Sequence, residues 1–314
     1  MTDSNLESIL QENRSFTPPA AFAARARITP AELAALNTEA ERDNVAFWAR
    51  LARQELSWHT KFKQILDDTQ APNYRWFADG MLNASYNCLD VHLAANGDKP
   101  AIIFEGEPGD SHTLSYRQLT AEVCRFANAL KAQGIQPGDR VVIYMPMVPE
   151  TVIAMQACAR IGATHSVVFG GFSAHSLRDR IRDASARMVI TADGGWRGGK
   201  NVELKSAVDA ALADGCKTIE KVIVFKRTGE PVTMQEGRDL WWSDVVKDQR
   251  DRCEPAWVGA EHPLFLLYTS GSTGKPKGIQ HSTAGYLLGA KLTTEWVFDL
   301  QDDDVFWCTA DVGW

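Results

Sequence analysis

The sequence predicts an α/β protein in which βαβ units form parallel sheets with helices on both faces, after a helical N-terminal extension. Three observations predict this class. From about residue 100 onward, short apolar runs alternate with amphipathic stretches of helical spacing. Turn-forming residues, such as Pro137-Gly138-Asp139 and Gly162, separate these units. A composition of 45% hydrophobic residues in 314 supplies enough apolar material for two or three packed units.

Residues 29–68 are expected to form the helical extension. Thr29 is a capping residue, Pro30 takes the first helical position, and Glu32 can reach back to the cap. An apolar stripe at helical spacing follows, made of Leu33, Leu36, Val45, Trp48 and Leu51. We expect Trp48, Trp58 and Phe62 to pack onto a neighbouring domain, so the extension carries no chemistry.

The alternating pattern then assigns elements in chain order. Buried strands are expected at 101–104 and 141–145, and further strands at 165–169, 188–191 and 221–225. Helices are expected at 151–160, 177–186 and 202–213. Residues 226–262 are polar and Trp-rich without a clear period, which indicates a surface excursion, and a second unit opens at the apolar run 263–268. The predicted organisation is an extension at 1–70, a first α/β subdomain at 71–262, and the start of a second at 263–314.

Charge and cysteine usage exclude several classes of function. The formal net charge is −7 and the isoelectric point is near 5.6, so we expect no nucleic-acid partner, although a few local Lys and Arg residues suffice to bind a small polyanion. The cysteines show neither a C-x-x-C pair nor metal-finger spacing to a histidine, which favours scattered reduced thiols. They are Cys88, Cys124, Cys158, Cys216, Cys253 and Cys308.

The sequence predicts a cytoplasmic protein without a membrane segment. The first residues are acidic and lack the apolar core of a secretion signal. The longest apolar stretch, Val141 to Val148, is far shorter than the roughly 20 residues that span a bilayer. The apolar, strand-like run Val305 to Trp314 ends on a bulky aromatic, and we therefore expect the chain to be the amino-terminal portion of a longer protein.

The most informative segment is Tyr268-Thr-Ser-Gly-Ser-Thr-Gly-Lys-Pro-Lys-Gly278. An apolar strand enters a loop of glycines, hydroxyls and lysines, and Ile279-Gln280-His281 leaves it as a return strand. Amides, hydroxyls and ammonium groups together can surround phosphate oxygens. A P-loop requires G-x-x-x-x-G-K-[ST] before a helix, but Gly274-Lys275 follows Gly271 too closely and Pro276 replaces the Ser or Thr. The alternative is a surface turn that is merely rich in Gly, Ser and Thr.

This string resembles the phosphate loop of the adenylate-forming superfamily, which includes acyl-CoA synthetases, peptide-synthetase adenylation domains and luciferases. Other segments narrow the resemblance. Trp76 to Asn83, with Tyr86 to Asp90 and His92, is similar to the entry segment of short-chain acyl-CoA synthetases. Val167 to Ser173 and Val305 to Trp314 are similar to the AMP-forming acetyl-CoA synthetase family. The resemblance runs from about residue 30 to the end and implies a truncated large N-terminal domain of the adenylate-forming fold.

The resemblance implies a ligase with ATP (with Mg²⁺), acetate and CoA as small-molecule substrates. A carboxylate attacks the α-phosphate of ATP to give an acyl-adenylate and pyrophosphate. The CoA thiol then attacks the acyl-adenylate, which forms the thioester and releases AMP. A loop of donors would stabilise the departing pyrophosphate. The implied ATP phosphate-binding residues are Thr269, Ser270, Gly271, Ser272, Thr273, Gly274 and Lys275, with Lys277 as a weaker candidate that could simply be solvated.

Arg197-Gly198-Gly199-Lys200 resembles the family's Arg-x-x-Arg site for the nucleotide end of CoA. Arginine pairs phosphate bidentately and stacks on adenine, whereas lysine offers a point charge, so Lys200 departs from the family pattern. The alternative is a solvated charge pair. Gly170-Gly171 would let the thin pantetheine arm approach the backbone, and the alternative there is a tight strand-to-helix turn.

The remaining candidates receive structural interpretations. Trp314 resembles the residue just ahead of the acyl pocket and is expected at its border, unless it is frayed as the last residue. Asp302-Asp303-Asp304 is expected to be a solvated loop rather than a metal site. His281 is expected to be a hydrogen-bonded structural histidine. No catalytic residue and no metal ligand is assigned in this chain.

Three hypotheses for function remain open. The first is an acetate–CoA ligase, and the second is a propionate or other short-chain ligase, because residues that size the acyl pocket would largely follow Trp314. The third is a non-catalytic module that binds nucleotide or CoA. In the family, the adenine and ribose contacts, the magnesium carboxylate and the mobile carboxy-terminal lobe come later, so we expect this chain alone to bind ATP or CoA weakly and to lack ligase activity. No feature of the sequence indicates an oligomeric state, either monomeric or higher.

Overall fold

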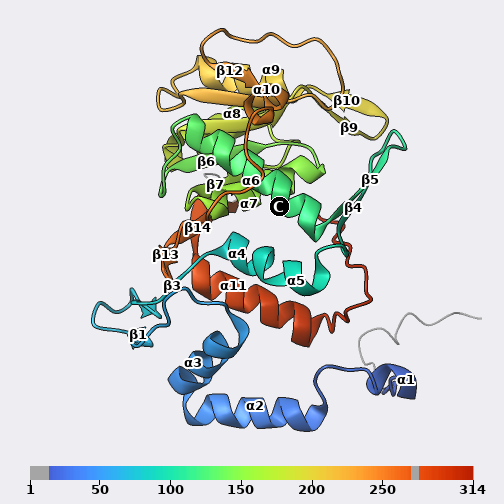
Figure 1. Cartoon of the computed structure of the whole chain (residues 1–314), viewed down its shortest axis with the longest axis vertical. Coiled ribbons are helices and arrows are strands. Elements are labelled where there is room, and N and C mark those ends of the chain that lie inside the picture. The colour runs from blue at the N-terminus through green and yellow to red at the C-terminus, as the bar shows by residue number, and fades with distance from the viewer. Residues whose placement is uncertain (1–13, 270–275, 314) are drawn as a thin grey trace, which may run out of the picture.

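The computed structural model describes residues 14–269 and 276–313. It confirms the α/β class: a seven-stranded sheet, in the order β12-β11-β8-β6-β7-β14-β15, lies between layers of helices (Figure 1). Each neighbouring pair is parallel except β14 and β15, which run antiparallel. The strands are β6 (Arg140–Tyr144), β7 (Thr164–Val167), β8 (Met188–Ala192), β11 (Lys221–Phe225), β12 (Asp239–Trp241), β14 (Pro263–Thr269) and β15 (Lys277–Ser282).

Alternate side chains of the central strands enter two hydrophobic cores. In β6, Val141 and Ile143 pack on one face, whereas Val142 and Tyr144 pack on the other. The first face is covered by α6 (Tyr116–Ala132), α7 (Pro149–Arg160) and α10 (Trp242–Val246). The second is covered by α8 (Ala174–Ala184) and α9 (Leu204–Ala213). Burial on both faces explains why these strands read as continuous apolar runs.

The helical extension consists of α1 (Ala20–Ala23), α2 (Pro30–Arg42) and α3 (Asn44–Glu55). The predicted capping box is confirmed: the Thr29 hydroxyl accepts a hydrogen bond from the Glu32 amide, and the Glu32 carboxylate accepts one from the Thr29 amide. Trp48, Trp58 and Phe62 join a cluster that includes buried side chains of α11 (Thr283–Leu292), which confirms their predicted packing role.

The prediction of helix from residue 56 to 68 is wrong. Leu56 is extended, and the segment continues into the short strand β1 (Leu66–Asp67). The Asp79 carboxylate accepts hydrogen bonds from the amides of Lys63 and Gln64 at 2.9 and 3.0 Å, so these amides are satisfied outside a helix. Aromatic packing of Phe62 on Phe77 holds the segment in place.

Short elements connect the extension to the sheet. They are β2 (Arg75–Trp76), β3 (Met81–Leu82), α4 (Ala84–Cys88), η2 (Asp90–His92) and α5 (Leu93–Asn96). Strand β1 pairs with β2, and β3 pairs with β13 (Val258–Gly259) far along the sequence.

The strand expected at 101–104 exists but lies outside the main sheet. It is β4 (Pro100–Glu105), which forms an antiparallel hairpin with β5 (Ser111–Ser115). Ile103 is 54% exposed, so the expectation of a buried strand is wrong. Only one face of the hairpin packs against the protein, through the partly buried Ile102 and Phe104.

The excursion at 226–262 is also more ordered than its composition predicts. It contributes the edge strand β12 and the helix α10, and Trp242 stacks on Phe126 in the core with ring centroids 3.6 Å apart. The proposed division after residue 262 falls before β14, which is hydrogen-bonded to β7 in the same continuous sheet.

Two further features complete the fold. The helix expected from residue 202 begins at Leu204, because β9 (Gly195–Arg197) and β10 (Lys200–Val202) form a hairpin before it. A π-helical turn, η3 (Thr293–Val297), extends α11. Within the described residues, no helix is both long enough and apolar enough to cross a membrane.

Candidate functional site

The candidate residues gather at one edge of the main sheet. Strands β6, β7, β8 and β14 run parallel, so their carboxyl ends meet at the same edge. In the sheet, β7 lies on one side of β6 and β8 lies on the other. The chain therefore reverses its direction across the sheet after β7. Ligands of open α/β sheets bind in the crevice at such a switch point.

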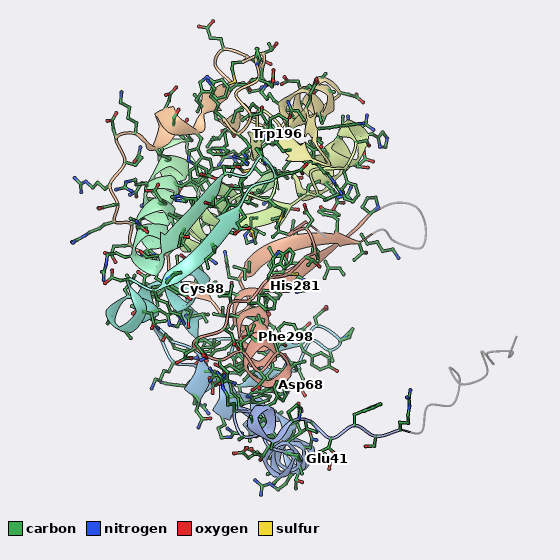
Figure 2. All side chains as sticks on the ribbon, turned by 90° about the vertical axis from the view of Figure 1, so that its right-hand side faces the viewer. Glu41, Asp68, Cys88, Trp196, His281 and Phe298 are labelled. Carbon is green, nitrogen blue, oxygen red and sulfur yellow. The ribbon has the colours of Figure 1, made fainter. Side chains whose placement is uncertain are left out.

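A cavity of about 430 Å³ lies at this edge. Its walls come from the segments that follow three strands: 145–148 after β6, 169–171 after β7, and 195–197 after β8. The hairpin β4–β5 and residues 307–311 close the remaining sides. Figure 2 shows Trp196 on the hairpin that borders the cavity, at the end of the molecule away from Glu41.

The β9–β10 hairpin presents the predicted Arg197-Gly198-Gly199-Lys200 segment. Gly198 and Gly199 form its turn with φ of +59° and +73°, which favours glycine at both positions. A methyl group added to either glycine would meet no atom within 4 Å, so backbone conformation rather than crowding selects glycine here. Both amides donate hydrogen bonds to the Glu107 carboxylate on the β4–β5 turn, and the bond from Gly198 measures 3.0 Å.

Arg197 lies at the mouth of the cavity. Its guanidinium stands over the Phe169 ring, 4.6 Å from the centroid, and it forms no ion pair with any residue in the described parts of the chain. The cation–π contact fixes the guanidinium while leaving its donors available. Lys200 likewise forms no ion pair within the described residues and is exposed, so the alternative of a solvated charge remains open for it.

Gly170 and Gly171 form a crowded turn after β7. A methyl group on Gly171 would lie 2.5 Å from the Phe169 ring and 2.8 Å from Arg197 Nη1, so glycine is needed for the two side chains to meet. The Tyr144 hydroxyl donates to the carbonyl oxygens of Gly170 and Phe172, 3.1 and 2.7 Å away. Because Tyr144 is on the neighbouring strand, the turn is fixed relative to the sheet.

The predicted phosphate loop lies between β14 and β15. Thr269 and Lys277 are cross-strand neighbours at its base, and both are exposed. Ser270, Gly271, Ser272, Thr273, Gly274 and Lys275 lie outside the described residues. The return strand expected at 279–281 is confirmed as part of β15.

The base of this loop is fastened to α8. The Tyr268 hydroxyl donates a hydrogen bond to Asp183 Oδ2 at 2.6 Å. Burial, and to a lesser extent the neighbouring Asp183 carboxylate, raises the pKa of the Tyr268 phenol. Gly278 is the cross-strand neighbour of Tyr268. A methyl group added to Gly278 would lie only 3.0 Å from the Tyr268 ring. The two strands therefore approach closely where the loop begins.

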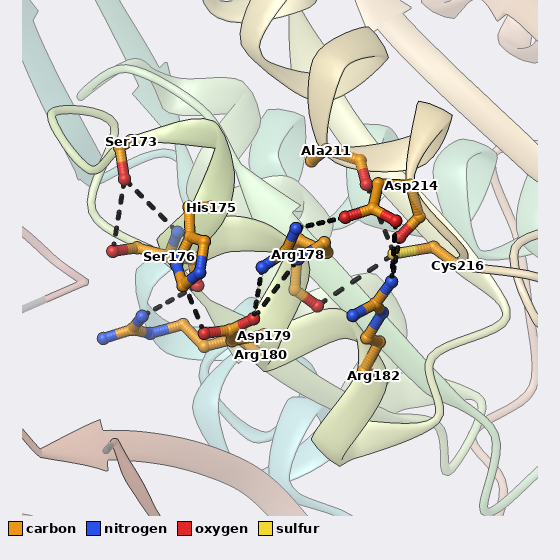
Figure 3. A network of polar contacts seen from close by, with 10 residues as sticks. All are labelled: Ser173, His175, Ser176, Arg178, Asp179, Arg180, Arg182, Ala211, Asp214 and Cys216. Carbon is orange, nitrogen blue, oxygen red and sulfur yellow. Dashed lines mark hydrogen bonds and ion pairs between the residues drawn. The ribbon is translucent and has the colours of Figure 1, made fainter. Parts of the chain in front are cut away.

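Helix α8 follows the Gly170-Gly171 turn and is anchored along its length. Its cap, Ser173, accepts a hydrogen bond from the Ser176 amide at 3.3 Å (Figure 3). Arg178 pairs with Asp179 and Asp214, and the latter follows α9 (Figure 3). One rigid helix therefore connects the glycine turn to the base of the phosphate loop.

The last residues line the cavity but do not test the acyl-pocket prediction, because Trp314 lies outside the described residues. Residues 307–311 form one wall, and a methyl group on Gly313 would lie 2.5 Å from the Phe169 amide nitrogen. The acidic run before them forms ion pairs with the extension, Asp302 with Arg27 and Asp303 with Arg25. The Asp302 and Asp303 side chains remain 99% and 75% exposed, as expected for a solvated loop.

His281 packs between aromatic rings. It stacks on Phe265 with centroids 4.5 Å apart and meets the edge of Tyr286 at 5.2 Å. The structural role expected for His281 is thus supplied by ring stacking, whereas the expected hydrogen bond of its imidazole is absent within the described residues. Across residues 14–269 and 276–313, no group of three or more His, Cys, Asp or Glu side chains is arranged to hold a metal ion.

Sequence reasoning missed the contribution of the β4–β5 hairpin. Phe104 and Glu107 line the cavity, and Arg227 reaches the same hairpin to pair with Asp110 at 2.6 Å. The string Glu105-Gly106-Glu107-Pro108-Gly109-Asp110 contains the turn-forming residues of a hairpin, which was the available signal. Nothing in that string indicates which loop it contacts.

Comparison with known families places two models on the chain. A model described as AMP-binding enzyme matches residues 89–314, and one described as acetyl-coenzyme A synthetase N-terminus matches residues 33–88.

Several curated relatives are named acetyl-coenzyme A synthetase. The protein of Methylobacillus flagellatus is 58% identical over 313 residues, which cover 99% of this chain and 48% of the relative. The protein of Nitrosomonas europaea is 59% identical over 311 residues, 98% of this chain and 48% of the relative. That of Thiobacillus denitrificans is 58% identical over 312 residues, with the same two coverages of 98% and 48%. The chain spans about half the length of the curated relatives it matches.

Proposed function

We propose a function from one premise: this chain belongs to the AMP-binding enzyme family, with an amino-terminal segment of the acetyl-coenzyme A synthetase type. The complete protein is an acetate–CoA ligase. It converts acetate and Mg-ATP to acetyl-adenylate and pyrophosphate, and then transfers the acetyl group to CoA with release of AMP. The names and identities of the relatives support acetate as the substrate.

The phosphate loop serves the first step. As the carboxylate attacks the α-phosphate, negative charge gathers on the β- and γ-phosphates, and preorganised donors lower the energy of that transition state. Thr269, Lys277 and the segment 270–275 between them would hold these phosphates. The link from Tyr268 to Asp183 supports this role, because it fixes the base of the loop.

The cavity serves the second step. Arg197 and the Gly198-Gly199 turn would bind the anionic nucleotide end of CoA at the mouth, with Lys200 as a supplementary charge. Gly170 and Gly171 would let the pantetheine arm pass along the backbone toward residues 307–311. The cavity and the phosphate loop lie at the same edge of the sheet. The CoA thiol would therefore reach the acetyl-adenylate along this edge.

One observation carries this proposal more than any other. The Arg197 guanidinium, which forms no ion pair within residues 14–269 and 276–313, and a cavity of about 430 Å³ lie at the same carboxyl edge of the sheet as the β14–β15 loop. A two-step ligase needs two substrates to meet, and the strand order supports the proposal, because the Gly170-Gly171 turn follows β7, the neighbour of β14.

The substrate assignment is tested on the complete protein. AMP release is measured with acetate, propionate and butyrate, each with and without CoA. We expect CoA-dependent AMP release, fastest with acetate. ADP as the product would contradict adenylation, and a preference for propionate would favour the short-chain alternative.

The role of the loop is tested by separating the two half-reactions. Replacing Lys275 and Thr273 together is expected to slow adenylation far more than thioester formation from supplied acetyl-adenylate. Equal losses in both steps would indicate general misfolding and contradict the assignment.

For this chain alone we propose weak binding of ATP or CoA without turnover, which is the non-catalytic module considered above. The magnesium-binding carboxylate and adenine contacts of the family would be supplied by the portion of the relatives that this chain does not span. Acetate-dependent exchange of pyrophosphate into ATP by these 314 residues would contradict this proposal.

A further inference from the structure

The Gly198-Gly199 turn already holds an anion, which is a carboxylate of the protein itself. Glu107 Oε2 accepts the Gly198 amide at 3.0 Å, and Oε1 accepts the Gly199 amide. Consecutive amides in left-handed conformations converge on one point and form a concave anion-binding site. The carboxylate therefore occupies the position that a phosphate oxygen of a ligand would take.

The surroundings favour an external anion at the same place. Arg197, directly before the turn, forms no ion pair within the described residues, and its guanidinium stands at the cavity mouth. Glu107, on the β4–β5 turn, lines the same cavity. A ligand that enters between the two hairpins must thus separate Glu107 from the amides, or bind beside a negative charge.

The β4–β5 turn has an anchor that does not involve Glu107. At the base, Arg227 holds Asp110 through two hydrogen bonds of 2.6 and 2.9 Å. A methyl group on Gly106 would lie 2.5 Å from Arg227 Nη2, so the glycine permits this bidentate contact. At the tip, Gly109 has a φ of +93° and open space around it. The Glu107 side chain can therefore leave the Gly198 and Gly199 amides without breaking the contact between Arg227 and Asp110.

We propose that Glu107 is a gate residue: its carboxylate caps the Gly198-Gly199 amides in the free protein and is displaced by an anionic group of the incoming ligand. This inference rests on the proposed function, in which that ligand is CoA. Glu107 sets affinity and selectivity at the site, because every ligand must compete with an internal carboxylate at high effective concentration.

The gate is tested on this chain with Glu107→Gln, which keeps the size of the side chain and removes its charge. Binding of CoA is measured by calorimetry, and that of inorganic pyrophosphate by the shifts of ¹⁵N-glycine amides. We expect Glu107→Gln to tighten both by roughly three- to ten-fold, since a charge-assisted competitor is lost. In the absence of ligand, the substitution should also shift the Gly198 and Gly199 amide resonances.

Glu105→Gln is the matched control. Glu105 is exposed, lines the same cavity and lies two residues earlier, but it forms no hydrogen bond to the turn. Equal gains from both substitutions would mean a general charge effect and would overturn the gate. Weaker binding in Glu107→Gln, or unchanged glycine resonances, would overturn it as well.

The outcomes also separate the gate from the proposed function. Unchanged CoA affinity in Glu107→Gln, with normal ligase activity in the complete protein, would remove the gate and leave the function. Tighter pyrophosphate binding with no effect on CoA would keep the gate and remove CoA as its ligand.

Discussion

Arg160 carries a positive charge in the interior, and Asp90 neutralises it. The guanidinium side chain is 4% exposed and binds both carboxylate oxygens at 2.7 and 2.9 Å, while its Nε donates to the Cys253 carbonyl oxygen. Three segments that are distant in the sequence are thereby joined. A buried charge that loses its partner costs far more than a surface pair gains.

We expect Asp90→Asn to lower the free energy of unfolding by about 2–4 kcal/mol, because it leaves the Arg160 charge uncompensated. Urea denaturation followed by circular dichroism measures this change. Asp98→Asn is the control. The Asp98 side chain, which pairs with Arg117, is 90% exposed, so this substitution should change the free energy of unfolding by less than about 1 kcal/mol. Similar losses in both variants would contradict the argument.

His165 makes stability depend on pH. Burial lowers its pKa from 6.5 to about 4. The unfolded chain therefore binds a proton more readily than the folded chain below pH 6.5, and stability present above that pH is lost as the pH falls toward 4.

Between pH 7 and 4.5 the loss from His165 should be about 2–3 kcal/mol. Denaturation at several pH values is compared for the native chain and His165→Gln, in which this part of the pH dependence disappears. His175→Gln serves as control, because His175 is 70% exposed at the side chain and its ion pair with Asp179 lies at the surface, where such pairs contribute little to stability. An unchanged pH profile in His165→Gln would disprove the assignment.

Individual site residues were predictable where a segment of the sequence resembled a family motif. The resemblance grouped Arg197, Gly198 and Gly199. In the structure Arg197 and Gly171 line the cavity, and Gly198 and Gly199 form the hairpin turn directly after Arg197. Glu107 was not predictable, because a carboxylate in a turn has no local signal of the amides it contacts. Its partner is 91 residues away in the sequence.

At the scale of elements, glycines in α11 and after α6 show how backbone conformation decides a substitution. Gly289 lies within α11 and Gly134 follows α6 with a φ of +88°, and neither would place a methyl group within 4 Å of another atom. Crowding is therefore absent at both, and only the backbone differs.

We expect Gly289→Ala to stabilise the protein by about 0.5–1 kcal/mol, because alanine favours a helix interior. Gly134→Ala should destabilise it by about 1 kcal/mol, because alanine resists the left-handed conformation. Thermal unfolding of both variants gives the comparison, and a change of the same sign in the two would contradict it.

Elements buried on both faces were predicted well, and half-buried ones were not. The runs that became β6, β8 and β11 are continuous in apolar residues, since helices cover both sides of the sheet. By contrast, β4 packs one face only, and β12 is a three-residue edge strand within a polar segment. Their positions depend on partners that periodicity does not identify.

At the scale of the whole molecule, the helical extension is part of the main fold. Figure 1 shows α3 beneath α11, the helix that follows the last strand of the sheet. Leu51 of α3 and Leu288 of α11 share one buried cluster, and Lys291 bonds to the Glu55 carbonyl oxygen at 3.0 Å. We infer that extension and sheet unfold together.

Leu51→Ala should therefore lower the free energy of unfolding of the entire chain by about 2–4 kcal/mol, within a single transition. Leu33 of α2 is 49% exposed, so Leu33→Ala should change the free energy of unfolding by less than about 0.5 kcal/mol. Denaturation is followed by far-ultraviolet circular dichroism and tryptophan fluorescence. Two separate transitions would show that the extension is an independent unit.

The cysteines of this chain give its cavity an experimental handle. Cys124, Cys158, Cys216 and Cys253 are buried and Cys88 is partly buried. Burial raises the pKa of all five thiols, that of Cys158 to about 12. Cys308 is exposed and lines the cavity. Because thiolates and not thiols react with maleimides, mild labelling should modify Cys308 selectively. A fluorophore placed there would signal each ligand that enters the cavity, without any engineered substitution.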